Sequence, residues 1–125
     1  GYVSRIKVQA NGYGNALYIT HKNGYTSVYG HLDRFNGPIK KYVEDEQYKN
    51  KSFEIDLYLE KDVFIVKQGD VVAYGGNTGG SSGPHLHFEI RDENQRPLNV
   101  LKFPIDIKDT ITIPRQLAAR SFIKK

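Results

Sequence analysis

Apolar and polar residues alternate along the first quarter of the chain. The alternation is clear in Arg5-Ile6-Lys7-Val8 and its flanks, and a period of two is typical of a half-buried strand. Residues 15–21 and 25–32 repeat the pattern. Asn23-Gly24 between them favours a hairpin with a type I′ turn, in which both central residues need positive φ. These segments predict an antiparallel meander of three strands.

The pattern changes between Asp33 and Val66. Asn36-Gly37-Pro38 can open a helix at Ile39, and the residues that follow have apolar positions near helical spacing. The acidic run 44–46 then lies on the solvated side of that helix, which we prefer to a metal cluster. Residues 53–59 alternate again and predict a strand. We therefore expect an inserted helix-plus-strand segment over about residues 33–66.

The second half of the chain returns to β patterning. Residues 71–74 predict a short buried strand, a glycine-serine loop follows over 75–83, and a further strand opens with His85-Leu86-His87. We expect a mainly β protein, an antiparallel sheet with a groove, organised as one domain over residues 1–105 and a C-terminal extension over 106–125, in which isoleucines suggest one more strand. The expected core consists of Leu17, Ile19, Val28, Val72, Leu86, Phe88 and Ile90.

Composition narrows the possible chemistry. The 125 residues suffice for one domain with a core, and the net charge of +4 favours an anionic partner without choosing between a cell-wall polymer and nucleic acid. The absence of cysteine excludes thiolate metal sites, so a metal would need His, Asp or Glu. No apolar run approaches the roughly 18 residues of a membrane span.

The four histidines are the candidate site residues. His85 and His87 share one face of their predicted strand because successive side chains alternate between faces. They either form part of a metal site or are simply polar residues on the solvated face of the strand. His31 ends the third predicted strand, and spacing alone allows a three-histidine zinc site of His31, His85 and His87. We expect His21, at the hairpin mouth, to be a solvated turn residue. The glycine loop lacks the features of a phosphate-binding loop or a serine nucleophile elbow.

Several short motifs resemble those of the lysostaphin-type zinc metallopeptidases, which are peptidoglycan endopeptidases with a β-sheet groove. They are Gly12-Tyr13-Gly14-Asn15, Tyr29-Gly30-His31-Leu32, residues 66–74, Gly76-Asn77-Thr78-Gly79 and Gly83-Pro84-His85-Leu86-His87-Phe88-Glu89. The resemblance runs in order from about Gly1 to Arg91. It implies that His87 is a zinc ligand and that His31 and His85 are catalytic, orienting water and stabilising the oxyanion. It also implies peptidoglycan peptides, not nucleic acid, as partner, and a location in the bacterial cell envelope.

The sequence departs from that family in one respect. The family takes two further zinc ligands from a His-x-x-x-Asp motif, and no histidine of this chain has an aspartate four positions later. We expect the motif to precede Gly1 in a longer protein, so that the chain as given is inactive. The alternatives are a degenerate member that activates a cell-wall amidase, or an envelope binding module.

Overall fold

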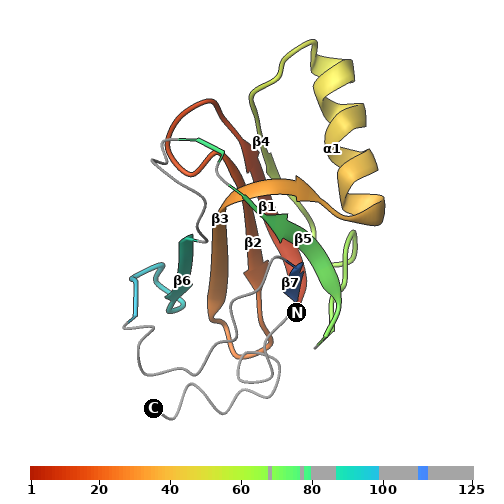
Figure 1. Cartoon of the computed structure of the whole chain (residues 1–125). Helices are drawn as coiled ribbons and strands as arrows, with labels where there is room; N and C mark the ends of the chain where they lie inside the picture. The colour runs from red at the N-terminus through yellow and green to blue at the C-terminus, as the bar shows by residue number, and fades with distance from the viewer. Residues whose placement is uncertain (68, 77, 80–86, 99–109, 113–125) are drawn as a thin grey trace.

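The protein is an antiparallel sheet with one helix, seen in a computed structural model that describes residues 1–67, 69–76, 78–79, 87–98 and 110–112 (Figure 1). The elements in chain order are β1 (Tyr2–Val8), β2 (Asn15–Thr20), β3 (Thr26–Phe35), α1 (Gly37–Asn50), β4 (Ile55–Tyr58), β5 (Val71–Gly75), β6 (His87–Arg91) and β7 (Thr110–Thr112). The strand order is β4-β1-β2-β3-β5-β7, and β6 also pairs with β3. All pairings are antiparallel. The predicted fold class is confirmed.

The insertion is a helix followed by a strand, as predicted. Strand β3 continues past the predicted end at Leu32 to Phe35, and helix α1 follows at once, with Asn36 as N-cap and a proline in its first turn. Ile39 and Val43 are the buried helix positions, while Lys40–Glu44 and Lys41–Asp45 pairs lie on the surface. Strand β4 then pairs with β1 and widens the sheet. Within the described ranges, no helix has the length and apolar character of a membrane crossing.

The sheet has two differently covered faces. Leu17 and Ile19 of β2 join the main core cluster, which also contains the two buried residues of α1. The alternate positions Ala16 and Tyr18 join a smaller cluster with Val28 on the opposite face. Val28 is therefore buried, but it was wrongly expected in the same core as Leu17: it lies directly opposite Tyr18 in the register, so the two share a face.

Strand β6 packs on the main core through Phe88, and its alternate position Ile90 is buried as well. Phe88 packs edge-to-face on Tyr29 with ring centroids 5.2 Å apart, and Ile90 is fully buried. Leu86, the remaining predicted core residue of this strand, lies outside the described residues. Strand β7 pairs with β5, so residues 110–112 belong to the sheet. The division of the chain at residue 105 stays a prediction.

The β2–β3 hairpin forms where the sequence predicted it, but with a different turn. Gly24 has a φ of +87°, whereas Asn23 does not adopt positive φ. The Gly24 N–H donates to the His21 carbonyl (2.9 Å), and the His21 N–H donates to the Tyr25 carbonyl (2.8 Å). A type I′ turn needs two central residues with positive φ, so that assignment was wrong. The longer loop places one left-handed residue, the glycine, where the chain reverses.

Candidate active site around His31

His31 lies where one edge of β3 changes partner. Residues before it pair with β6, with Gly30 opposite His87, and residues after it pair with β5, with Leu32 opposite Gly75. The backbones of His31 and His87 are therefore neighbours in the sheet. Gly75, where β5 ends, and His87, where β6 begins, both lie beside this part of β3.

A β-bulge sets the direction of the His31 side chain. Along the β2 edge, Asn15 pairs with Leu32 and Leu17 pairs with Tyr29, so β3 has one residue more than β2 in this stretch. His31 has a φ of +56°, a left-handed conformation that non-glycine residues seldom adopt. Bulges of this kind interrupt the alternation of side chains and re-aim one of them. Such local strain persists only where surrounding contacts enforce it.

Hydrogen bonds to the carbonyls of Tyr13 and Thr78 help to hold His31. Its backbone N–H donates to the Tyr13 carbonyl (2.6 Å), and its ring Nδ1 lies 2.6 Å from the Thr78 carbonyl oxygen. Because a carbonyl oxygen only accepts, Nδ1 carries the proton, and the lone pair of the neutral ring is on Nε2. The ring of Tyr13 meets the imidazole edge-on, with centroids 6.1 Å apart. His31 is thus a buried imidazole with a defined tautomer, suited to accept a proton at Nε2.

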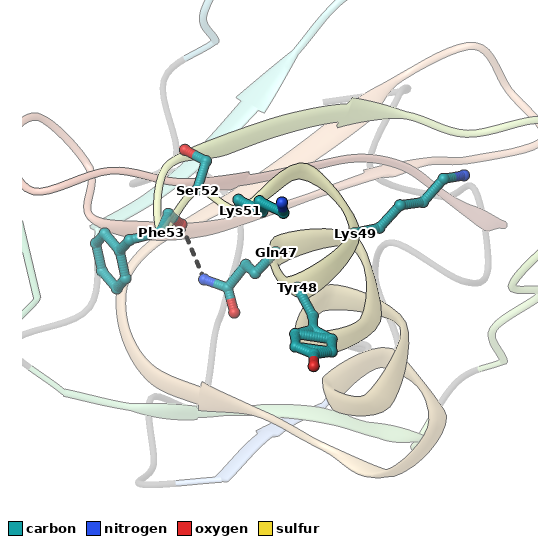
Figure 2. A pocket seen from close by; sticks show the side chains of 6 residues that line it. All are labelled: Gln47, Tyr48, Lys49, Lys51, Ser52 and Phe53. Atoms are coloured by element: carbon teal, nitrogen blue, oxygen red, sulfur yellow. Dashed lines mark hydrogen bonds between the residues drawn. The ribbon is translucent and has the colours of Figure 1, made fainter.

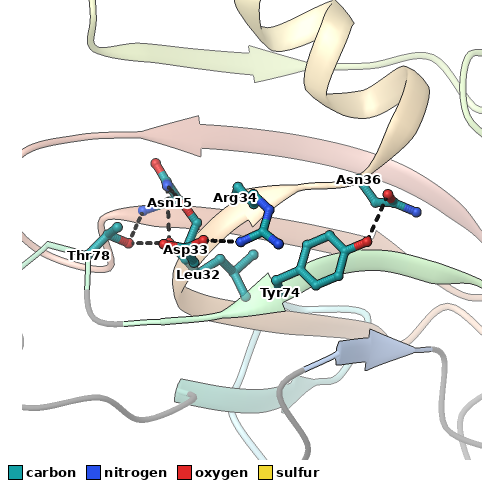
Figure 3. Close-up of polar contacts among 7 residues, drawn as sticks. All are labelled: Asn15, Leu32, Asp33, Arg34, Asn36, Tyr74 and Thr78. Atoms are coloured by element: carbon teal, nitrogen blue, oxygen red, sulfur yellow. Dashed lines mark hydrogen bonds and ion pairs between the residues drawn. The ribbon is translucent and has the colours of Figure 1, made fainter.

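Thr78 anchors the glycine loop beside His31. Its Oγ1 donates to the Leu32 carbonyl (2.6 Å) and accepts from the Asn15 N–H (3.0 Å). The Asn15 side-chain amide donates to the carbonyls of Leu32 and Asp33, at 3.0 and 3.1 Å (Figure 3). The same threonine therefore holds the loop through its hydroxyl and orients the His31 ring through its carbonyl.

Two glycines make this contact close enough. Gly14 has a φ of +64°, and a Cβ built there would lie 2.4 Å from the Thr78 carbonyl carbon. Gly79 has a φ of +78°, and a Cβ there would lie 2.3 Å from the Gly14 nitrogen. Both positions need glycine for the backbone angle and for the approach of the two loops. In the sequence Gly14 and Gly79 stand in two separate motifs, and nothing local in either motif indicates that the two glycines meet.

A polar chain leads from His31 along the face that carries Tyr18. Tyr13 donates its hydroxyl to Glu89 of β6, and Arg91 Nε donates to Glu89 Oε1 (2.9 Å). Burial and then the Glu89 carboxylate raise the pKa of Tyr13 above its usual value, so this hydroxyl stays protonated at neutral pH. Sequence reasoning assigned no role to Tyr13 or Glu89, although both stand inside the quoted motifs.

The other predicted site residues are described only in part. The backbone of His87 belongs to β6, but its side chain and the whole of His85 lie outside the described residues. The roles predicted for His31, His85 and His87 therefore stay predictions.

The prediction for His21 was wrong. Its side chain is 6% exposed, and Nε2 lies 2.8 Å from Ser27 Oγ. Position 21 continues the alternation of Leu17 and Ile19, so the side chain lies on the core face of the sheet although β2 ends at Thr20. Burial, and secondarily the positive charge of the Gly1 amino group, lower the pKa of His21 to about 4.

The described side chains do not form a zinc site. No group of three metal-ligating side chains occurs among them. Asp33 is paired with Arg34, and Glu89 is held by Tyr13 and Arg91. A protein zinc site needs three or four ligands, and the sequence has no His-x-x-x-Asp to add to His87. A site of the lysostaphin type therefore needs ligands that this chain does not supply.

Comparison with known proteins points to cell-wall peptidases. The model of peptidase family M23 matches residues 56–100. The DD-carboxypeptidase/endopeptidase Mpg of Neisseria meningitidis serogroup B is 34% identical over 97 residues, which cover 78% of this chain and 17% of Mpg. The peptidoglycan DD-endopeptidase ShyB of Vibrio cholerae is 37% identical over 65 residues, which cover 52% of this chain and 15% of ShyB. The chain thus spans less than a fifth of these relatives.

A solved structure shares the fold. The catalytic domain of the prophage-encoded M23 protein EnpA from Enterococcus faecalis, solved as a mutant, superposes with a TM-score of 0.50 at 19% identity. The superposition covers 84% of this chain and 65% of the EnpA chain.

Proposed function

Since this chain belongs to peptidase family M23, the lysostaphin-type metallopeptidases, we propose that its protein hydrolyses peptide bonds in the stem or cross-bridge peptides of peptidoglycan. Zinc would be the cofactor of the complete domain, and the protein would act in the bacterial cell envelope. The observation that carries the proposal is the restraint of His31: a left-handed residue at a bulge, beside the backbone of His87, with its tautomer set by the Thr78 carbonyl.

His31 has the chemistry that peptide hydrolysis needs from an acid-base group. With the proton on Nδ1, its Nε2 accepts a proton from an attacking water and returns it to the leaving amine. The Thr78 carbonyl stabilises the imidazolium that forms in between, because it continues to accept from Nδ1. His85 would steady the developing oxyanion, and His87 would be a zinc ligand.

The test compares three alanine variants of the protein in a form that includes a His-x-x-x-Asp segment. His87→Ala should lose both zinc and activity, because three protein ligands become two. His31→Ala and His85→Ala should keep zinc and fold, and lose about two to four orders of magnitude in turnover. The measurements are zinc content and release of peptides from purified peptidoglycan.

The matched control is Phe53→Ala, which removes a side chain that is 63% exposed beyond the end of α1. It should change neither zinc content nor turnover. If His85→Ala loses zinc while His87→Ala retains it, the roles of the pair are reversed.

The sequence feature that favours the alternative function, an activator of a cell-wall amidase, is the lack of a His-x-x-x-Asp motif. The alternative is supported if the form of the protein with a His-x-x-x-Asp segment binds one zinc and still releases no peptides from peptidoglycan.

A further inference from the structure

The sheet face that carries Tyr13 continues away from His31 toward the β1–β4 edge. Tyr13 packs on the cluster of Ala16, Tyr18 and Val28, so its ring lies on the face opposite the main core. On β6 the same face carries Glu89, which pairs with Val28 in the register, and then Arg91 two residues further. Tyr13, Glu89 and Arg91 are joined by hydrogen bonds, so the face is continuous from the His31 ring to Arg91.

A hollow of about 360 Å³ lies at the far end of this face. Two guanidinium groups and two tyrosine rings are among the side chains that line it, those of Arg5, Tyr18, Tyr58 and Arg91, and we call it the arginine–tyrosine hollow. Arg5 lies over the rings of both Tyr18 (5.0 Å) and Tyr58 (4.7 Å), and Arg91 lies over Tyr18 (5.5 Å). These stacked contacts hold both guanidinium groups in place before any ligand arrives.

Three hydroxyl groups from β1, β2 and β3 also line the hollow. Thr20 Oγ1 donates to Ser4 Oγ (2.8 Å) and lies 3.4 Å from Thr26 Oγ1. Hydroxyl groups both donate and accept, so this side can hydrogen-bond a peptide backbone that approaches the arginines. The hollow therefore combines two held cations with hydroxyl groups that can donate or accept.

Arg5 and Arg91 each have N–H groups that are not used by the carboxylates beside them. Arg5 uses Nε and Nη2 for the carboxylate of Asp56, at 2.8 and 2.6 Å, and Arg91 uses Nε for Glu89. In the described part of the chain, Arg5 Nη1 and both Nη atoms of Arg91 have no hydrogen-bond partner. A ligand carboxylate in the hollow can therefore accept from these unused N–H groups, which belong to two guanidinium groups over the same Tyr18 ring.

The insertion contributes one lining residue of this site, Tyr58, and the carboxylate that holds Arg5. Asp56 and Tyr58 belong to β4, which pairs with β1 and places Leu57 opposite Ile6 and Tyr58 opposite Arg5. Tyr58 is 73% exposed, so its ring forms a wall that solvent and ligand can reach. The helix-plus-strand segment therefore extends the sheet face and adds an aromatic wall to it.

The spacing fits an extended peptide. From His87 to Arg91 the β6 backbone runs four residues, about 14 Å at the usual strand rise, and a bound peptide in extended conformation covers that length with about four residues. On the basis of the proposed function, we propose that the arginine–tyrosine hollow binds a carboxylate of the peptide substrate about four residues from the bond that is cut. A carboxamide has the shape of a carboxylate but no charge, so the hollow would bind a substrate with a free carboxylate more tightly than one in which that group is amidated.

The test measures binding of two synthetic stem peptides, one with free carboxylates and one with every carboxylate converted to a carboxamide. We expect calorimetry to show at least about tenfold weaker binding of the amidated peptide, because the carboxamide oxygen still accepts a hydrogen bond from arginine but no longer carries the negative charge of an ion pair. The Nε–H signals of Arg5 and Arg91 in nitrogen-15 correlation spectra should shift with the free-acid peptide only. The preference should also fall as salt concentration rises.

Matched variants test the site itself. Arg91→Gln removes one cation, and Tyr58→Ala removes the exposed wall without disturbing the core; both should reduce the preference to about threefold or less. The control is Tyr48→Ala, which removes another exposed tyrosine of the insertion. Tyr48 is 84% exposed and lines a separate hollow at the end of α1, with Gln47 and Phe53 (Figure 2). This variant should keep the full preference.

Three results would overturn the inference: equal affinity for the two peptides, no measurable binding of either, or an unchanged preference in both Tyr58→Ala and Arg91→Gln. Peptide release from peptidoglycan, measured on the same preparations, separates this outcome from a failure of the proposed function. A protein that hydrolyses peptidoglycan without the preference refutes the carboxylate site alone. A protein that shows the preference but never hydrolyses refutes the peptidase function and leaves the carboxylate site in place.

Discussion

The buried histidine His21 should make the stability of the protein depend on pH between about 4 and 6.5. The pKa of His21 is lowered from 6.5 to about 4 in the fold, chiefly by burial. Between these values the unfolded chain binds a proton that the folded chain does not bind, so the free energy of unfolding rises with pH. The contribution of neutral His21 is complete above pH 6.5 and is lost as the pH falls toward 4.

The magnitude follows from the two pKa values. At pH 5 the unfolded state is almost fully protonated at this histidine and the folded state almost not at all, which costs about 2 kcal/mol of stability relative to pH 7.5. For a domain of this size such a loss lowers the melting temperature by roughly 6–10 °C. Carboxylates also titrate near pH 5, so the effect of one histidine must be isolated by substitution.

The assay is chemical denaturation at pH 7.5 and pH 5 for the wild type and for His21→Gln, which keeps a hydrogen-bonding side chain opposite Ser27 and does not titrate. The variant should lose about 2 kcal/mol less than the wild type between the two pH values. Parallel curves, with the same loss in both proteins, would refute the assignment of His21 as a buried neutral imidazole.

Three further outcomes are expected. Thr78→Val keeps the side-chain shape but removes the hydroxyl that bonds the Asn15 N–H and a β3 carbonyl, so it should lower stability by about 1–3 kcal/mol and reduce peptide release, both measurable on one preparation. Gly14→Ala places a Cβ against the backbone of Thr78 and Gly79 and should lower the melting temperature more than Gly69→Ala does. Gly69 has a φ of +89° but no atom within 4 Å of an added Cβ, so that variant measures the backbone strain alone. Equal decreases in melting temperature would show that the close contact at Gly14 contributes nothing. The chain as given should retain no stoichiometric zinc after dialysis against a weak chelator, because it holds one ligand of the lysostaphin type, and metal analysis that finds about one zinc per chain would contradict this.

Local patterns determined most of the fold. The period-two alternation before Ala10, in residues 15–32 and in 53–59 predicted strands that the structure contains, because each strand buries one face against the same core. Asn36 and the proline that follows predicted the start of α1, since an N-cap and an early proline act within one helical turn. These signals need no information from distant parts of the chain.

From the sequence, His31 was predicted as a site residue near His87, but its backbone conformation and its tautomer could not be predicted. The bulge and the left-handed backbone at His31 depend on β3 having β6 and β5 as successive partners along one edge. The tautomer depends on the carbonyl of Thr78, which lies 47 residues away in the sequence. A motif shows which residue types are present, whereas hydrogen bonds across such separations exist only after the sheet has formed.

Burial was the other property that tertiary structure decided. His21 stands beside a turn, where polar residues are usually solvated, yet its position on the core face leaves it 6% exposed. The arginine–tyrosine hollow likewise combines side chains from β1, β2, β6 and the inserted β4, and its four residues Arg5, Tyr18, Tyr58 and Arg91 form no motif in the sequence. Alternation and turn signals are local in the chain and can be derived from the sequence, while the desolvation of a side chain and the convergence of charges depend on which segments the fold brings together.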